Sequence, residues 1–418
     1  MKRFFLFVMT FILVFVITTA SVSPQGETTT FTVYFHYTPE EARGVLIRQI
    51  FDEYSKAHQG KVKIIQSYFA DWIPFQEKIR IMAASGTPPD LFIFNYNPND
   101  LSLFESGQLM DFGPYMDDEW RNRFSPSDLE CLTFDGKLLA IPVEQGPVQF
   151  YYNKKLFDEA GIKEFPKTWD EFFEDCDKLK EAGINAVSLF TSDDGWHATN
   201  YLSYFAVSIG GPDILLQESL NSPAMVEAAR MLQKLFKYAT EDSIGSKWAV
   251  SVQNFITERS AILLDGPWTI GMMDGQMENP DQVIIAPPPT LKEGDPYYVI
   301  SDTITPWGAS GKLSDAQKQA VADFLRYLTS EEISKRFAID GKLLFAVKSE
   351  LTQEEKEKAG PKLAGNIEIT ENSKGRIFQI TRVIKPAVKN EMPRLLESLV
   401  LGKITPEQFA EELQKYNK

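Results

Sequence analysis

The sequence predicts an α/β protein of two lobes, each built on a parallel sheet flanked by helices. The chain has 418 residues, which is too long for one compact domain and suits two. Apolar residues make up 43% and charged residues 24%, a balance typical of globular proteins. Strand and helix patterns also alternate along the chain, and this alternation favours parallel sheets covered by helices on both faces.

The alternation begins in the first hundred residues. Apolar residues at every second position predict a strand at 31–35. Thr38-Pro39-Glu40-Glu41 then predicts an N-cap, a proline at the first helical position and a capping box, with the helix running to about residue 58. A strand at 62–68, a helix with Phe75, Ile79 and Met82 on one face, and a short apolar strand at 91–94 follow.

The same pattern resumes after the middle of the chain. Thr168 and Glu171 form a second capping box, which opens a helix to residue 180, and a strand is expected at 186–190. A helix begins at Ser222-Pro223, strands follow at 261–264 and 283–286, and Ser314 caps another helix. The last 90 or so residues are expected to be mostly helical, with breaks at Pro386, Pro393 and Pro406.

The N-terminus predicts export. Lys2 and Arg3 precede an uncharged apolar run at 4–17, and small residues up to Ala20 suit a signal peptidase, so residues 1–20 are expected to be a signal peptide. An uncleaved anchor is the alternative, although the run is short for a span of about 20 residues. No cysteine lies near the junction for a lipid anchor. We therefore expect a protein free in the periplasm.

Charge and cysteine content narrow the partners. The net charge of −15 disfavours nucleic acid and anionic lipid as partners.

Cys131 and Cys176 could form a disulfide after export, but Cys176 lies on an apolar helix face, which favours buried free thiols. The three histidines, His36, His58 and His197, are too scattered to predict a metal site. No cofactor motif is present, and we expect neither cofactor nor metal.

Seven phrases in consistent order resemble the family 1 extracellular solute-binding proteins, which include maltose-binding receptors. They are ASGTPPD at 84–90, GKLLAIP at 136–142, YYNKKLF at 151–157, AGI at 160–162, PKTWDEF at 166–172, DGPW at 265–268 and FLRYLTSEE at 324–332. The resemblance implies a periplasmic-binding-protein fold of the second type, with a ligand cleft between two α/β lobes. It also implies a soluble, monomeric receptor of an ABC importer, which delivers a sugar to the permease subunits in the membrane and is not an enzyme.

The resemblance also implies a map of the lobes. The N-terminal lobe is expected to hold residues 27–141 and 290–329, and the C-terminal lobe residues 142–289 and 330–418. The chain would cross near 141–146, 286–290 and 329–332. Cys131 and Cys176 would then lie in different lobes, and a disulfide between them would lock a hinge that must move.

Ligands of open α/β sheets bind beyond the carboxyl ends of strands, so residues there are candidates for the cleft. His36 follows the first expected strand, Asp71 and Trp72 the second, and Asn95, Tyr96 and Asn97 the third. Aromatic rings suit the C–H faces of a sugar, and amides and carboxylates suit its hydroxyls. For the asparagines the alternative is turn formation, and for Trp72 it is packing on its own helix.

Four further residues complete the predicted site. Trp268 follows Gly266-Pro267, which ends a strand abruptly, and it matches the tryptophan of the family's phrase. Trp196 lies in a polar loop, where a ring needs a reason for exposure. Glu144 follows the first crossing, where a carboxylate could accept two hydroxyls or simply face solvent. Asp302 lies where the family places a contact loop, although residues 300–307 lack the family's paired glycines. Trp307 is expected in the core.

Two alternatives remain open. A secreted glycoside hydrolase needs two carboxylates about 5 to 10 Å apart, and Glu144, Asp193, Asp194 and Asp265 could supply them, but the seven ordered phrases argue against it. A receptor for a polyamine, peptide, metal or phosphate ester would keep the binding role. Few basic residues lie in the candidate loops, which disfavours phosphate, whereas a cation would suit the acidic residues with aromatic walls.

Overall fold

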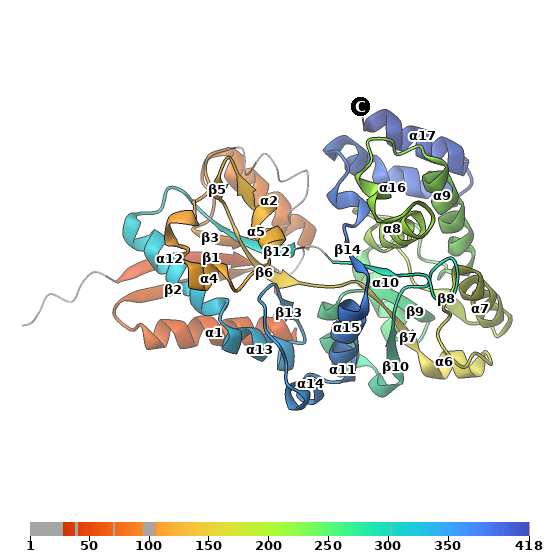
Figure 1. Ribbon diagram of the computed structural model, residues 1–418, viewed down its shortest axis with the longest axis horizontal. Helices are drawn as coiled ribbons and strands as arrows, with labels where there is room; N and C mark the ends of the chain where they lie inside the picture. The colour runs from red at the N-terminus through yellow and green to blue at the C-terminus, as the bar shows by residue number, and fades with distance from the viewer. Residues whose placement is uncertain are drawn as a thin grey trace, which may run out of the picture.

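The structure is a computed structural model that describes residues 28–37, 41–69, 72–94, 103, 106–301 and 303–417. It has two lobes joined by several passages of the chain (Figure 1). Within the described residues, no helix combines the length and the apolar character needed to cross a membrane. The expected signal peptide lies outside the described residues, and so does the expected capping residue Thr38.

The N-terminal lobe is built on a six-stranded sheet in the order β13-β6-β12-β3-β1-β2. β1 pairs in parallel with β2 and β3, whereas β12 and β13 pair antiparallel to their neighbours. Its strands are β1 Thr29–Phe35, β2 Val62–Tyr68, β3 Leu91–Ile93, β6 Ile141–Gln145, β12 Thr303–Ala309 and β13 Leu344–Phe345, with a separate hairpin of β4 Thr133–Phe134 and β5 Lys137–Leu138. Its helices are α1 Ala42–Ala57, α2 Trp72–Ala84, η2 Gly113–Tyr115, α4 Asp118–Arg121, α5 Pro126–Glu130, α12 Asp315–Leu328 and α13 Glu331–Ile339.

The C-terminal lobe holds a four-stranded sheet in the order β10-β7-β9-β8, in which only β8 and β9 pair in parallel. Its strands are β7 Gln149–Asn153, β8 Asn185–Val187, β9 Ser260–Asp265 and β10 Val283–Ala286, and a second sheet pairs β11 Tyr298–Ile300 with β14 Gly375–Ile377. Its longer helices are α6 Lys154–Glu159, α7 Trp169–Glu181, α8 Trp196–Gly210, α9 Pro223–Leu235, α10 Trp248–Ile256, α11 Ile270–Gln276, α15 Pro361–Asn372, α16 Pro386–Val400 and α17 Pro406–Tyr416. Short 3-10 turns are η3 Pro212–Leu216, η4 Phe236–Tyr238, η5 Pro267–Thr269, η6 Pro280–Gln282 and η7 Ile380–Arg382.

Both sheets are therefore mixed, whereas strand and helix alternation predicted parallel ones. In these two sheets the parallel pairs are β1 with β2, β1 with β3, and β8 with β9, and at least one helix lies between the two strands of each pair along the chain. β12 joins the N-terminal sheet after a long excursion through the C-terminal lobe and pairs antiparallel with β3 and β6. Such long-range pairing leaves no local trace in the sequence.

The crossings between the lobes differ from the expected map at two places. β6 belongs to the N-terminal sheet and β7 to the C-terminal one, so the chain crosses between residues 145 and 149. The return falls after β11 rather than near 286–290, because Ile300 packs in the C-terminal core. The last crossing falls after β13 rather than at 329–332, since Ile333, Phe337 and Phe345 pack in the N-terminal core. α14, Gln353–Ala359, lies along this last passage.

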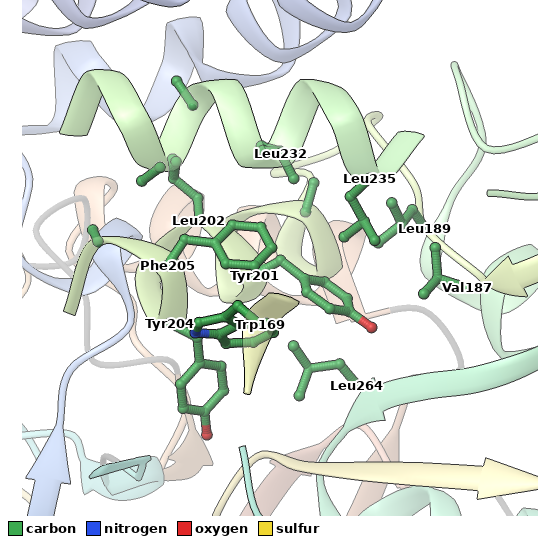
Figure 2. Close-up of a cluster of buried hydrophobic side chains, with 14 of the residues drawn as sticks. Trp169, Val187, Leu189, Tyr201, Leu202, Tyr204, Phe205, Leu232, Leu235 and Leu264 are labelled. Carbon is green, nitrogen blue, oxygen red and sulfur yellow. The ribbon is translucent and has the colours of Figure 1, made fainter. Parts of the chain in front are cut away.

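Each lobe has its own hydrophobic core. Trp120 and Trp307 are enclosed in the N-terminal core, as expected for Trp307. In the C-terminal core, Trp169 packs edge-on against Phe205 of α8, and Leu232 of α9 lies above them (Figure 2). Cys131 and Cys176 are not joined by a disulfide and lie in different lobes. A third cluster joins the lobes, because Ala338 of α13 packs with residues of β7, β9 and α15.

Two helix boundaries differ from prediction. α1 begins at Ala42 rather than at Pro39, with Glu41 in extended conformation before it. Pro393 was expected to break a helix but lies inside α16. The proline removes one backbone donor, yet the helix continues because Val388, Met392, Leu395, Leu396 and Leu399 are buried along one face. Tertiary burial outweighs the lost hydrogen bond there.

The capping box predicted at Thr168 is confirmed. The backbone N–H of Glu171 donates to the Thr168 hydroxyl at 3.2 Å, and the Glu171 carboxylate accepts from the Thr168 N–H at 3.1 Å. We expect Thr168→Ala to lower the free energy of unfolding by about 1 kcal/mol, because the backbone N–H of Glu171 in the first turn of the helix loses its hydrogen-bond acceptor. Denaturant titration measures this loss. Thr168→Ser keeps the acceptor and should restore most of it; equal losses in the two variants would contradict the capping role.

Candidate ligand-binding site

The predicted site residues divide between those the structure describes and those it does not. His36, Trp72, Glu144, Trp196 and Trp268 are described, whereas Asp71, Asn95, Tyr96, Asn97 and Asp302 lie outside the described residues. The described five gather in two groups, one on each lobe. The candidate site is therefore described from these five residues and their neighbours.

On the N-terminal lobe, His36 and Trp72 lie close together, each just after the end of a strand. His36 follows β1, Trp72 opens α2 after β2, and their ring centroids are 4.2 Å apart. Arg43, on the first turn of α1, lies with its guanidinium 4.7 Å over the Tyr37 ring and 3.5 Å from the His36 Nε2. Burial, assisted by Arg43, lowers the pKa of His36 well below its usual value. The imidazole is therefore neutral at physiological pH.

Glu144 lies near the end of β6 and is only 2% exposed. Its Oε2 is 3.8 Å from Arg43 Nη1, while Arg43 Nε donates to Glu41 Oε2 at 2.6 Å. Burial raises the pKa of Glu144 to about 8, and the nearby Thr305 hydroxyl only partly offsets this. The sequence suggested a carboxylate that accepts two hydrogen bonds. The raised pKa instead favours the neutral acid at pH 7, a form that can both donate and accept.

This pKa shift predicts a pH dependence of stability. Below pH 4.5 both the folded and the unfolded chain keep the proton on Glu144, whereas between about 4.5 and about 8 only the folded chain keeps it. The free energy of unfolding should thus fall as pH rises through this window. We expect Glu144→Gln to gain stability at pH 8, on the order of a few kcal/mol, and none at pH 4.5.

Denaturant titrations of the two proteins at both pH values measure this difference. The exposed Glu332 provides a control, and Glu332→Gln should leave the pH dependence unchanged. A Glu144→Gln variant with the same pH dependence as the unmodified protein would show that Glu144 titrates normally in the folded state.

On the C-terminal lobe, two tryptophans lie side by side. Trp268 belongs to η5, just after β9, and Trp196 is the first residue of α8 rather than part of a polar loop as predicted. Their ring centroids are 5.7 Å apart with an interplanar angle of 53°. Both rings are partly buried. A Cβ atom on Gly266 would lie 2.2 Å from the Trp268 ring, so only glycine lets this ring fold back over the strand end.

Trp268 faces the N-terminal lobe. It packs against the N-terminal hydrophobic core, whereas Trp196 packs against the C-terminal one. Just after Trp268, a Cβ atom on Gly271 would lie 3.5 Å from the Cβ of Ala42, the neighbour of Arg43. The start of α11 thus meets the start of α1. The tryptophan pair of the C-terminal lobe and Arg43 of the N-terminal lobe consequently lie near the place where the two lobes meet.

Sequence reasoning missed Arg43 at the site and one exposed ring of the C-terminal lobe, Phe378. Arg43 was part of an expected helix, but its position in the first turn after the β1 strand end was a usable signal. Phe378 follows β14 and remains 41% exposed. It lies beside α8, because the Gln379 side chain donates to the Thr199 hydroxyl and the Ile380 N–H donates to the Ser203 hydroxyl. No local pattern around Phe378 indicates this position.

Asp265, one of the carboxylates considered for a hydrolase, is enclosed within the C-terminal lobe. Asp265 is 0% exposed, and its carboxyl oxygens accept from Trp248 Nε1 at 2.9 Å and from the Gly266 N–H at 2.7 Å. His197 links Asp265 to Ser251 through both ring nitrogens, at 3.1 Å and 2.8 Å. This resembles a Ser-His-Asp chain, but the serine contacts Nδ1 and all three side chains are fully buried. A substrate cannot reach these groups.

A family model described as bacterial extracellular solute-binding protein matches residues 38–335. The chain belongs to this family. Among curated relatives of the solute-binding protein, a maltotriose-binding protein of Pyrococcus abyssi is 23% identical over 302 residues, covering 70% of this chain and 62% of the relative. An sn-glycerol-3-phosphate-binding periplasmic protein of Agrobacterium fabrum is 28% identical over 295 residues, covering 64% of each.

Solved structures share the fold. A chitin oligosaccharide binding protein superposes with a TM-score of 0.83 at 23% identity, covering 93% of this solute-binding protein and 98% of that chain. Maltose-bound MalE3 of T. maritima superposes with a TM-score of 0.76 at 20% identity, covering 92% and 98%. The predicted two-lobed α/β fold is thereby confirmed. The family and these neighbours are binding proteins, and the family is an extracellular one.

Proposed function

We propose that this solute-binding protein is the receptor of an ABC importer and that it binds a neutral sugar or oligosaccharide between its lobes. The observation that carries the proposal is the tryptophan pair of the C-terminal lobe, with ring centroids 5.7 Å apart, in which Trp268 packs against the N-terminal core near the place where α11 meets α1. Flat rings stack on the C–H faces of sugars, and their edges leave the hydroxyls free for polar partners.

The charges of the described site favour a neutral ligand. Arg43 is already paired with Glu41 at 2.6 Å, and Glu144 and His36 are both uncharged near pH 7. A phosphate ester needs an uncompensated cation, and a polyamine needs ionised carboxylates. A sugar needs neither. Glu144 can donate to one hydroxyl, and Arg43, whose Nη2 lies 3.5 Å from His36 Nε2 and whose Nη1 lies 3.8 Å from Glu144 Oε2, can donate to another.

The delivery step follows from the two-lobed shape. A sugar that contacts both lobes stabilises the closed arrangement, because its binding energy differs between the open and closed states. The permease can then distinguish a loaded receptor from an empty one. We also propose that the chain is exported by residues 1–20, remains free in the periplasm as a monomer and leaves its ligand chemically unchanged.

A thermal-shift panel on residues 21–418 tests the proposal. We expect one class among malto-, xylo- and chito-oligosaccharides to raise the melting temperature, since a ligand at 100 times its dissociation constant adds about 2.7 kcal/mol to the native state. sn-Glycerol 3-phosphate and spermidine should leave it unchanged. A shift produced only by either of these two compounds would contradict the assignment of a neutral sugar.

A further inference from the structure

We propose that His197 is a positioning residue: its buried hydrogen bond to Asp265 fixes the distance and angle between the Trp196 and Trp268 rings and thereby the receptor's affinity for sugar. The inference rests on the proposed function and deepens it. It concerns the four side chains of Ser251, His197, Asp265 and Trp248, named here the Asp265 network.

The Asp265 network ties together the two segments that carry the rings. His197 follows Trp196 directly on α8, and Asp265 ends β9 three residues before Trp268. The bond from His197 Nε2 to Asp265 Oδ2, 3.1 Å long, is therefore a cross-link between the bases of the two tryptophans. The two rings contact each other at 5.7 Å between centroids, Trp196 also contacts the His197 ring at 5.5 Å, and Trp268 packs against the N-terminal core while Trp196 packs against the C-terminal one.

The network is braced from a third element. Trp248 and Ser251 both lie on α10, and they contact Asp265 at 2.9 Å and His197 at 2.8 Å respectively. A carboxyl group in a fully buried position costs free energy unless donors surround it. Here the Nε2–H of His197, the Nε1–H of Trp248 and the Gly266 N–H supply three donors. The arrangement has one low-energy geometry, which makes it suitable for preorganising a binding surface.

The network also determines the path of the chain after β9. The Gly266 N–H donates to the Asp265 Oδ1 at 2.7 Å, and the Thr269 hydroxyl donates to the Gly266 carbonyl at 2.8 Å. These bonds hold the turn that folds the Trp268 ring over Gly266. Loss of the His197 donor would leave the Asp265 carboxyl partly unsatisfied and free to draw the turn toward another partner. The Trp268 ring would then shift relative to Trp196.

His197→Leu tests the inference, with Leu413→Ala as the matched control. Leu413 is a fully buried residue of α17, a helix that packs on α9 and α16 and contains no residue of the site. Both variants should lower the melting temperature. Only His197→Leu should weaken binding of the strongest ligand among malto-, xylo- and chito-oligosaccharides, by about tenfold or more. His197→Gln can still donate to Asp265 and should recover part of the affinity.

A measurement without sugar separates the ring geometry from binding. The near-ultraviolet circular dichroism of the tryptophans should change in His197→Leu and stay unchanged in Leu413→Ala. Unchanged affinity and dichroism in His197→Leu would overturn the inference while leaving the proposed function intact. If His197→Leu does not fold, the isosteric Asp265→Asn serves in its place, with the same expected loss and the same contradicting result. Failure of the unmodified protein to bind any of these sugars would overturn both the proposed function and this inference.

Discussion

Trp268→Ala is expected to weaken sugar binding by about 30-fold or more and to change the melting temperature little. The ring lies between Trp196 and the N-terminal core at the junction of the lobes, and central aromatic residues of this kind typically contribute about 2 kcal/mol or more to binding. Trp268 is only partly buried in the free protein, so its removal should leave no large cavity. Isothermal titration with the oligosaccharide selected by the thermal-shift panel measures the change.

Trp268→Phe is the control for this experiment. It keeps a flat ring that can stack on a sugar, and it should retain most of the affinity. A Trp268→Ala variant that binds as tightly as the unmodified protein would place the ligand elsewhere. A large decrease in melting temperature with unchanged affinity would mean that the ring stabilises the packing of the lobes and does not bind the sugar.

Trp169→Ala should cause the largest loss of stability, about 3 to 5 kcal/mol for the C-terminal lobe. The side chain is 2% exposed, and its Nε1 donates to the Ser208 hydroxyl at 2.9 Å. Its ring packs edge-on against Phe205 with centroids 4.7 Å apart, at the centre of the core in Figure 2. The substitution thus creates a cavity and removes the donor to Ser208.

Guanidinium titration followed by circular dichroism measures this loss. Because two lobes can unfold in separate steps, the transition of the C-terminal lobe should move to lower denaturant while that of the N-terminal lobe stays in place. Leu216→Ala is the matched control, since Leu216 is 58% exposed, and it should change stability by less than about 0.5 kcal/mol. A loss below about 1 kcal/mol for Trp169→Ala would contradict the described packing.

The parts of the fold with local sequence patterns were predictable. The capping box at Thr168, the N-cap at Ser314 and the alternating strand β1 appear where the sequence placed them. The pairing of β11 with β14 and the membership of α13 in the N-terminal lobe were not, because both depend on contacts between residues far apart in the chain. The lobe boundaries shifted for this reason.

The site was predictable to a similar extent. His36 and Trp72, which the sequence placed after two strand ends, lie with ring centroids 4.2 Å apart, and the DGPW phrase indicated the turn that carries Trp268. The contact of Trp268 with Trp196 and the raised pKa of Glu144 depend on burial between distant elements. A single sequence contains no such information. The ligand-binding role of every candidate remains a prediction, and Asp71, Asp302 and the residues at 95–97 also lie outside the described residues.

Calorimetric titration of residues 21–418 with a neutral oligosaccharide, followed by recovery of the sugar, tests most directly whether the molecule is a sugar receptor. We expect saturable binding of one molecule per chain, with the sugar recovered intact and no comparable heat from sn-glycerol 3-phosphate. Hydrolysis of the sugar, or saturation by the phosphate ester alone, would contradict the proposed function.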